Sequence, residues 1–441
     1  MRLSHFGYGV LVLLVSHLAF AADHAEVQFN MPSDTEAIAE LTLSSPAASW
    51  DKAGAEGAVA TLSLDGQYNQ DVLVVRGTEP STFKVFLGPL SAGEHRLAVQ
   101  RNAQYSAANA GLQIANVRAY ASTASGEEAR ALDHAPILFA REDTVGRFSD
   151  APLLSWYERL PEASGETIQY SMIFTNEDSG TPIDALMSRW GRGTDVEYIY
   201  RVTFDAQGKI TNEIFQGPDH ADLHFTGKKL GAHPYFTNVA RNNIFFDAGS
   251  APIQYRFVPI PFDLSQHSRE EVIDQNPWIY SVMAAELRRE GKIREEKIRD
   301  GNKATIPQIA DPRNYLYLEF SAENRNCGAI AWVKLRNEQK WRSSHNGRLD
   351  YSVMRSGWFR TTIELPSGTT AEQIEAIAFE PVDLRDPRLP MPGPAPQSTL
   401  HAGGKAFLLD QQYRPGTNLM GPHPEVTLKP GEMYQLTVSS H

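Results

Sequence analysis

The chain has 441 residues and a formal net charge of −12, with 41% hydrophobic and 21% charged residues. This composition excludes global disorder, and the length is sufficient for two or three domains. An acidic surface repels phosphate backbones, so nucleic acid is a poor candidate for a partner. Cys327 is the only cysteine, which excludes an internal disulfide and a cysteine cluster for zinc or iron–sulfur.

The first 21 residues have the pattern of an export signal. Arg2 supplies a positive start, an apolar run follows, and Ala19-Phe20-Ala21 provides the small residues that a signal peptidase needs. The apolar run is too short to span a bilayer, and no later segment reaches that length. We therefore expect residues 1–21 to be a signal peptide and the mature chain to be exported, to the periplasm or the extracellular space.

Short strands with turn residues between them dominate the rest of the chain. Between residues 22 and 121 they recur about every ten residues, which predicts an immunoglobulin-like β-sandwich. The polar stretch from Ser122 to Arg130 is typical of a linker. We predict a second β-sandwich over 131–262, a helical segment over 263–303 with an apolar stripe that includes Trp278 and Leu287, and a β-rich portion over 304–441. The predicted fold class is all-β, made mostly of antiparallel β-sandwiches, with one notable helix and several domains.

The stretch 172–201 concentrates polar groups between two apolar runs, where a site is expected. An acidic loop with Glu177 and Asp178 leads into a short helical stretch that carries Asp184, and a strand with Asp195 and Glu197 follows. Asp195 and Glu197 stand at i and i+2, which places both carboxylates on one face of the strand. By the same alternation Arg201 lies on the same face as Glu197, and Tyr198 and Tyr200 lie together on the other face.

Two chemistries suit paired carboxylates: binding of a divalent cation through oxygen ligands, or acid and base roles in glycoside cleavage. For the cation the candidate ligands are the four acidic residues Asp184, Asp195, Glu197 and Asp222. A second group is His220-x-Asp222-x-His224, which we expect on one face of another strand. Imidazole and carboxylate ligands at i and i+2 suit a transition metal, and imidazole is also the usual proton shuttle near neutral pH. The candidate catalytic residues are Asp195, Glu197, His220 and His224.

Arg189-Trp190-Gly-Arg192 follows the helical stretch, and Arg beside Trp suits recognition of a sugar or a carboxylate. The candidate ligand-binding residues are Glu177, Asp178, Arg189, Trp190, Arg192 and Arg201. The alternative interpretation is structural. Acidic residues and arginines on one strand face also form ion pairs on a wet surface, and Trp190 also suits packing.

One resemblance rests on short motifs between Asp133 and Asp247. The order of His134-Ala-Pro-Ile, the turn into Asp195-Val-Glu197, and His233-Pro-Tyr-Phe-x-Asn-Val-Ala-Arg resembles the vacuolar-sorting-related β-sandwich family. It is more distantly similar to the necrosis-inducing protein family, in which an Asp-x-Glu strand, an earlier Asp and a His hold a divalent cation. In this resemblance, Asp195 and Glu197 match the Asp-x-Glu pair of that family, and Asp184 takes the place of its earlier Asp. Arg192 stands where that family has the His, a departure that puts the cation in question.

Two functions follow from these patterns. The first is an enzyme, a carbohydrate-active hydrolase or lyase, that acts on an extracellular or envelope polysaccharide through the acidic and His-bearing face of the second sandwich. The alternative is a non-catalytic envelope-binding or adhesion protein that uses the same face as a ligand platform. The two differ in geometry, because an enzyme requires that these groups converge in a concave pocket.

Overall fold

The structure, a computed structural model, describes residues 23–141, 144–163, 165–177, 179–238, 242–294, 306–384 and 394–439. Three predicted features lie outside these ranges: the expected signal peptide, Asp178 and the end of the predicted helical segment. Within them the chain is all-β with few helices, as predicted, and most strand pairs are antiparallel. No described helix has the length and hydropathy that crossing a membrane requires.

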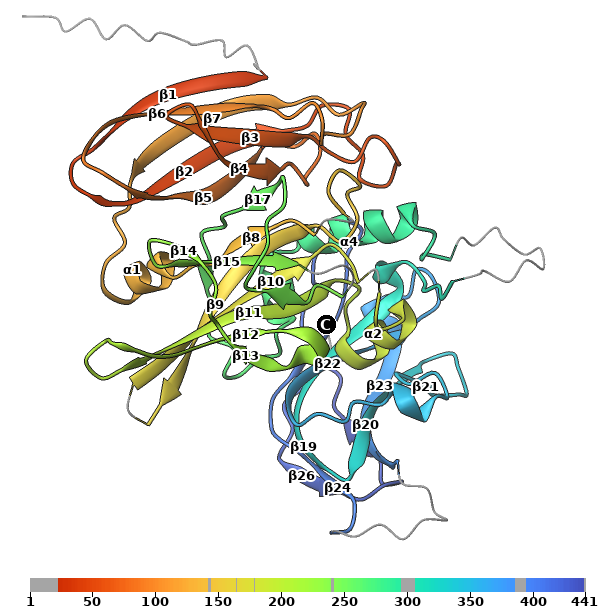
Figure 1. Cartoon of the computed structure of the whole chain (residues 1–441). Coiled ribbons are helices and arrows are strands. Elements are labelled where there is room, and N and C mark those ends of the chain that lie inside the picture. The colour runs from red at the N-terminus through yellow and green to blue at the C-terminus, as the bar shows by residue number, and fades with distance from the viewer. Residues whose placement is uncertain are drawn as a thin grey trace, which may run out of the picture.

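The first sandwich, at the top of Figure 1, packs a four-stranded sheet of order β1-β6-β3-β4 against a three-stranded sheet of order β5-β2-β7. Its strands are β1 (His24–Met31), β2 (Thr35–Ser44), β3 (Val59–Leu64), β4 (Gln67–Leu73), β5 (Ser81–Leu90), β6 (Gly93–Arg101) and β7 (Gln113–Ala121). Alternate aliphatic side chains of the two sheets, such as Leu41, Leu62 and Val99, fill the space between them.

The second sandwich pairs a six-stranded sheet, β13-β12-β11-β10-β9-β18, with a smaller sheet of order β14-β15-β8-β17 to which β16 is added. Its elements are α1 (Gly126–Asp133), β8 (Ile137–Phe139), β9 (Pro152–Glu162), β10 (Gly165–Phe174), α2 (Ile183–Trp190), β11 (Asp195–Asp205), β12 (Ile210–Gln216), η1 (Pro218–His220), β13 (Asp222–His224), β14 (Lys229–Leu230), β15 (His233–Asn238), β16 (Phe245–Phe246), β17 (Gln254–Tyr255) and β18 (Ile260–Pro261). Helix α1 occupies much of the stretch predicted to be a linker, because Ala131 and Leu132 give the segment an apolar side that is buried.

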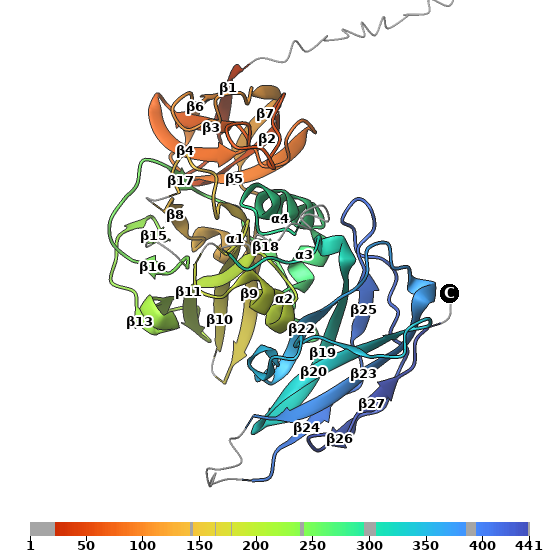
Figure 2. The same ribbon diagram turned by 90° about the vertical axis from the view of Figure 1, so that its right-hand side faces the viewer.

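The predicted helical segment is α3 (Glu271–Gln275) followed by α4 (Trp278–Arg289), and α4 is the longest described helix, with 12 residues. The third sandwich lies at the opposite end of the molecule from the first (Figure 2). It contains η2 (Pro312–Asn314), β19 (Tyr315–Arg325), β20 (Cys327–Leu335), β21 (Arg342–Ser343), η3 (Leu349–Tyr351), β22 (Gly357–Glu364), η4 (Ala371–Gln373), β23 (Ile374–Asp383), β24 (Gln397–Leu400), β25 (Lys405–Leu408), β26 (Val426–Leu428) and β27 (Tyr434–Leu436). Its sheets are β22-β19-β24-β26, with β25 also paired to β19, and β21-β20-β23-β27.

The three sandwiches share an apolar core around α4. One cluster of buried residues joins Trp50 of the first sandwich, Trp156 of the second, Met283 of α4 and Tyr317 of the third. A hydrogen bond also connects the first sandwich to the second, since the Gln254 amide donates to the Asn69 carbonyl oxygen at 2.7 Å. The first sandwich is therefore attached to the rest by packing as well as by the chain.

Candidate functional site

The candidate site forms where three neighbouring strands begin or end. Phe174, the last residue of β10, pairs with Asp195 of β11 on one side and with Pro152 of β9 on the other. Because the strands are antiparallel, the loop after β10 lies beside the starts of β9 and β11. This arrangement brings together Glu177, Asp195 and Glu197, which we call the acidic cluster.

Asp195 and Glu197 lie on the same side of β11, as the i, i+2 spacing predicts. They pair with Phe174 and Met172 of β10, both of which face the core between the two sheets. The rest of the predicted alternation is wrong, because the pairing shifts at Ile199, which is an extra residue in β11.

This β-bulge turns Tyr198 away from Tyr200 and toward Arg201. The Arg201 guanidinium lies 3.9 Å from the centre of the Tyr198 ring, and both side chains donate hydrogen bonds to Asp222. Arg201 and Asp222 consequently belong to a surface ion pair outside the acidic cluster.

Asp195 is 1% exposed and is held by neutral donors. Its Oδ1 accepts from the Val196 backbone N–H, and its Oδ2 accepts from the Asn243 amide at 2.8 Å. The same Asn243 nitrogen donates to Asp150 at 2.6 Å, and Arg141 forms a 3.0 Å ion pair with Asp150. Asn243 therefore joins two buried carboxylates.

The two glutamates of the cluster have unusual protonation. Burial, and then the charge of Asp195, raises the pKa of Glu177 to about 7 and that of Glu197 to about 8. The Glu197 side chain accepts a hydrogen bond from the Gln216 amide and is 11% exposed. It reaches the surface beside His220, whose Nδ1 lies 3.8 Å from Glu197 Oε2 and whose side chain is 54% exposed.

A further carboxyl group lies behind the cluster. Glu286 of α4 accepts hydrogen bonds from the Asp150 backbone N–H at 2.8 Å, from the Asn176 amide at 2.6 Å and from the Trp50 indole at 3.2 Å. Burial and the neighbouring Glu290 raise the pKa of Glu286 to about 7. Lys292 extends this support, since its ammonium group donates to Asn176 and to the Glu177 carbonyl oxygen.

The His-x-Asp-x-His pattern does not lie on one strand. His220 ends the short helix η1 with a positive φ of 56°, and only Asp222 and His224 belong to β13. His220 is beside Glu197, Asp222 binds Tyr198 and Arg201, and His224 is exposed on the edge strand β13. The η1 turn, which begins at Pro218 directly after Gly217, therefore keeps His220 out of the strand.

The remaining predicted residues serve other contacts. Asp184 accepts a hydrogen bond from the Tyr351 hydroxyl at 2.8 Å, and Arg192 pairs with Glu270 at 3.1 Å. Arg189 lies over the Trp190 ring, 4.3 Å from its centre. The four predicted cation ligands Asp184, Asp195, Glu197 and Asp222 are thus divided among three places. In the part of the chain that the structure describes, this set does not fit a single cation.

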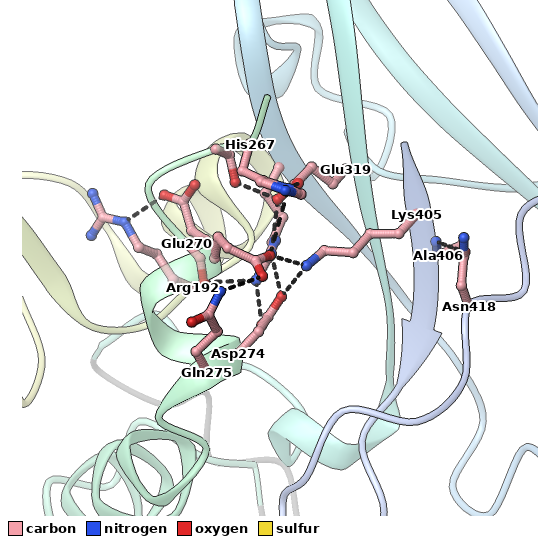
Figure 3. A network of polar contacts seen from close by, with 12 residues as sticks. Arg192, His267, Glu270, Asp274, Gln275, Glu319, Lys405, Ala406 and Asn418 are labelled. Carbon is pink, nitrogen blue, oxygen red and sulfur yellow. Dashed lines mark hydrogen bonds and ion pairs between the residues drawn. The ribbon is translucent and has the colours of Figure 1, made fainter. Parts of the chain in front are cut away.

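A different group of possible metal ligands lies between α3 and β19 (Figure 3). His267, Glu271 and Glu319 bring one ligand atom each within 4.8 Å of one another. The fit to a cation is nevertheless poor, because Arg360 already pairs with Glu319 at 2.8 Å and Lys405 with Glu271. These contacts belong to what we call the junction network, whose members are Arg192, His267, Glu270, Glu271, Asp274, Glu319, Arg360 and Lys405.

Comparisons with known proteins give no family. No protein family model and no characterised relative matches the chain. Among solved structures, the chain is similar to a family two carbohydrate esterase from Clostridium thermocellum in complex with cellohexaose, at 17% identity and a TM-score of 0.16, over 30% of this chain and 33% of that one. It is also similar to a ruminal GH26 endo-β-1,4-mannanase, at 10% identity and a TM-score of 0.18, over 27% and 26%. This chain thus aligns with about a third or less of each of these two structures. At these identities and TM-scores, no property of either protein is assigned to this chain.

Proposed function

We propose that the protein is an enzyme that cleaves an extracellular or envelope polysaccharide by acid–base catalysis. The observation that carries the proposal is the pair formed by Glu197 and His220, 3.8 Å apart. Glu197 is a buried carboxyl group, with a side chain that is 11% exposed and a pKa raised to about 8, and the His220 imidazole is exposed. A carboxyl group that keeps its proton at neutral pH is suited to act as a general acid, and imidazole is suited to act as a base. The choice of a polysaccharide rests on the expected export of the chain.

The burial of the cluster favours elimination over hydrolysis. Hydrolysis with two carboxylates requires that both face the sugar, yet Asp195 is 1% exposed and remains behind Glu197. In an elimination, His220 removes the proton from the carbon next to a uronate carboxyl group, and a carbon–carbon double bond forms. The carbon–oxygen bond to the leaving sugar breaks, and Glu197 gives its proton to the departing oxygen. Asp195 acts as a positioning residue, because its charge helps to keep Glu197 protonated.

The test is a screen of the purified chain, without residues 1–21, against neutral and uronate-containing polysaccharides. New reducing ends report any cleavage, and ultraviolet absorbance of an unsaturated product reports elimination alone. Glu197→Gln and His220→Asn are each expected to lower the rate by about 10²–10⁴-fold.

A matched control pair exists in the third sandwich, where the exposed His401 lies 2.7 Å from Glu425. Glu425→Gln and His401→Asn are expected to leave the rate unchanged. Absence of cleavage across the whole panel would replace the enzyme with the non-catalytic binding protein. Full activity of Glu197→Gln would refute the role of the Glu197 and His220 pair in the cleavage.

A further inference from the structure

A groove of about 420 Å³ lies between the first and second sandwiches, away from the acidic cluster, with which it shares no residue. Its walls come from β5, the start of β9, the segment between β17 and β18, and the start of α4. Most of the lining is apolar, including Val75, Phe83, Leu153, Phe257, Ile260 and Trp278. Its volume is within the range of about 300–1,000 Å³ that is usual for small-molecule sites.

The groove also carries positive charge, in contrast to the acidic chain as a whole. Arg76 and Lys84 line it and are exposed, and no ion pair involves either side chain within the described part of the chain. Arg76 lies over the Trp278 ring, 5.6 Å from its centre. Glu128 is the exposed acidic residue of the lining, since Asp71 is 1% exposed and accepts hydrogen bonds from Thr61 and Tyr68.

A buried cation lies among the groove residues as well. Arg256 is 6% exposed, and its Nη1 donates to the Leu87 carbonyl oxygen at 2.6 Å. Its Nε–H has no acceptor among the described residues, and a buried donor without an acceptor is costly. The guanidinium itself is directed toward Leu87, outside the groove lining. The charge of the groove therefore depends on the two exposed cations Arg76 and Lys84, which outnumber the exposed Glu128 and favour an anion.

The apolar walls select against a free glycan. Each sugar hydroxyl that leaves water needs a hydrogen-bond partner, and the aliphatic and aromatic side chains of the walls offer few. A hydrocarbon chain needs no such partner and gains free energy from the burial of its surface.

We propose that this groove binds a linear amphiphile with an anionic head group, with the chain along the apolar walls and the head group at Arg76 and Lys84. The chemical class is that of a fatty carboxylate. This inference is independent of the proposed polysaccharide-cleaving activity and goes beyond it.

The experiment is calorimetric titration of the purified chain with octanoate, decanoate and dodecanoate, below their micelle concentrations, and with dodecanol as the uncharged probe. Each added methylene is expected to tighten binding by about fourfold, which corresponds to about 0.8 kcal/mol. Dodecanoate is expected to bind more tightly than dodecanol. The double variant Arg76→Gln/Lys84→Gln should remove that preference without changing the affinity for dodecanol.

Two further variants complete the test. Ile260→Asp places a charge on the apolar wall at a residue that is 38% exposed, and it should weaken both probes while the melting temperature stays near that of the wild type. Arg325→Gln, an exposed arginine of β19 that pairs with Glu323, should change neither. Lack of binding, an affinity independent of chain length, or equal affinity for dodecanoate and dodecanol in the wild type would overturn the proposal.

Discussion

The Asn243 amide nitrogen donates to Asp195 Oδ2 at 2.8 Å, and the same nitrogen donates to Asp150 Oδ2 at 2.6 Å. One neutral side chain, fully buried and from a loop after β15, thus holds two carboxylates that belong to different strand ends. This arrangement holds Asp195 in a fixed position through neutral hydrogen-bond donors. It also makes Asn243 the residue whose loss should disturb the acidic cluster most directly.

Asn243→Gly is predicted to lower the free energy of unfolding by about 1–3 kcal/mol, because it leaves two buried carboxylates without their shared donor. Glycine is chosen because Asn243 has a positive φ of 41°, which glycine adopts without strain. Asn346→Gly is the matched control. Asn346 also has a positive φ, of 49°, but it is exposed. Urea unfolding of the two variants measures the difference, and equal losses would show that the bonds to Asn243 contribute nothing.

The second prediction is a fall in stability as pH rises. The pKa values of Glu177 and Glu197 are raised in the folded chain, to about 7 and about 8, from an ordinary value of 4.5. Their stabilising contribution is therefore complete below about pH 4.5 and is lost as pH rises through 7 and 8, at about 1.4 kcal/mol per pH unit for each proton released. Glu197→Gln should flatten the decline in unfolding free energy between about pH 4.5 and pH 8. The exposed Glu425→Gln should retain the wild-type profile, and an unchanged profile in Glu197→Gln would refute the assignment of the raised pKa.

The third prediction concerns Arg360 in the junction network. The Arg360 side chain is fully buried and pairs with Asp274 at 2.6 Å and Glu319 at 2.8 Å, which joins α3 to the third sandwich. Arg360→Gln is predicted to cost about 3–5 kcal/mol, because it leaves two carboxylates buried with one cation fewer. Thermal unfolding measures the change. Arg348→Gln, which breaks an exposed pair with Asp350, should leave the melting temperature unchanged; a similar fall in both variants would contradict the prediction.

The fourth prediction tests how firmly the first sandwich is attached to the second. A protease site introduced at residues 122–125 allows the chain to be cut between the first two sandwiches. The two parts are predicted to stay associated after cleavage, because Trp50 and Leu73 contribute to the core around α4 and His233 lies 3.2 Å from Glu36. Gel filtration of the cut protein under native conditions provides the measurement. Elution of the first sandwich as a separate species would show that the contacts across the boundary are weak and would support a simple linker.

Local patterns were sufficient for most of the longer strands, for α2 and α4, and for the placement of Asp195 and Glu197 on the same side of β11. The pairing of carboxylates at i and i+2 follows from strand geometry alone. The bulge at Ile199 could not be predicted, since an extra residue in a strand has no signature in an apolar run. It places Arg201, which binds Asp222, on the other side of β11 from Asp195 and Glu197.

The supporting residues were missed for a different reason. Asn243, Asp150 and Glu286 come from a loop after β15, the start of β9 and a helix of another region, and only the packing of these elements brings them to the cluster. A polar residue that is buried among distant segments has no distinguishing neighbours in the sequence. Export, the domain boundaries and the identity of the substrate remain predictions.

The hydrogen bond between Trp50 and Glu286 joins residues that are 236 positions apart. A contact of such long range forms late, since the entropy of closing a large loop must be overcome first. During synthesis the first sandwich emerges well before α4 exists, so its Trp50 surface stays uncovered until more than half of the chain has been made. Glu286 also holds Asp150 and Asn176, so the loops around the acidic cluster gain their final support only when α4 docks. The order of events along the chain thus delays the maturation of the candidate site until α4 has been made and has docked.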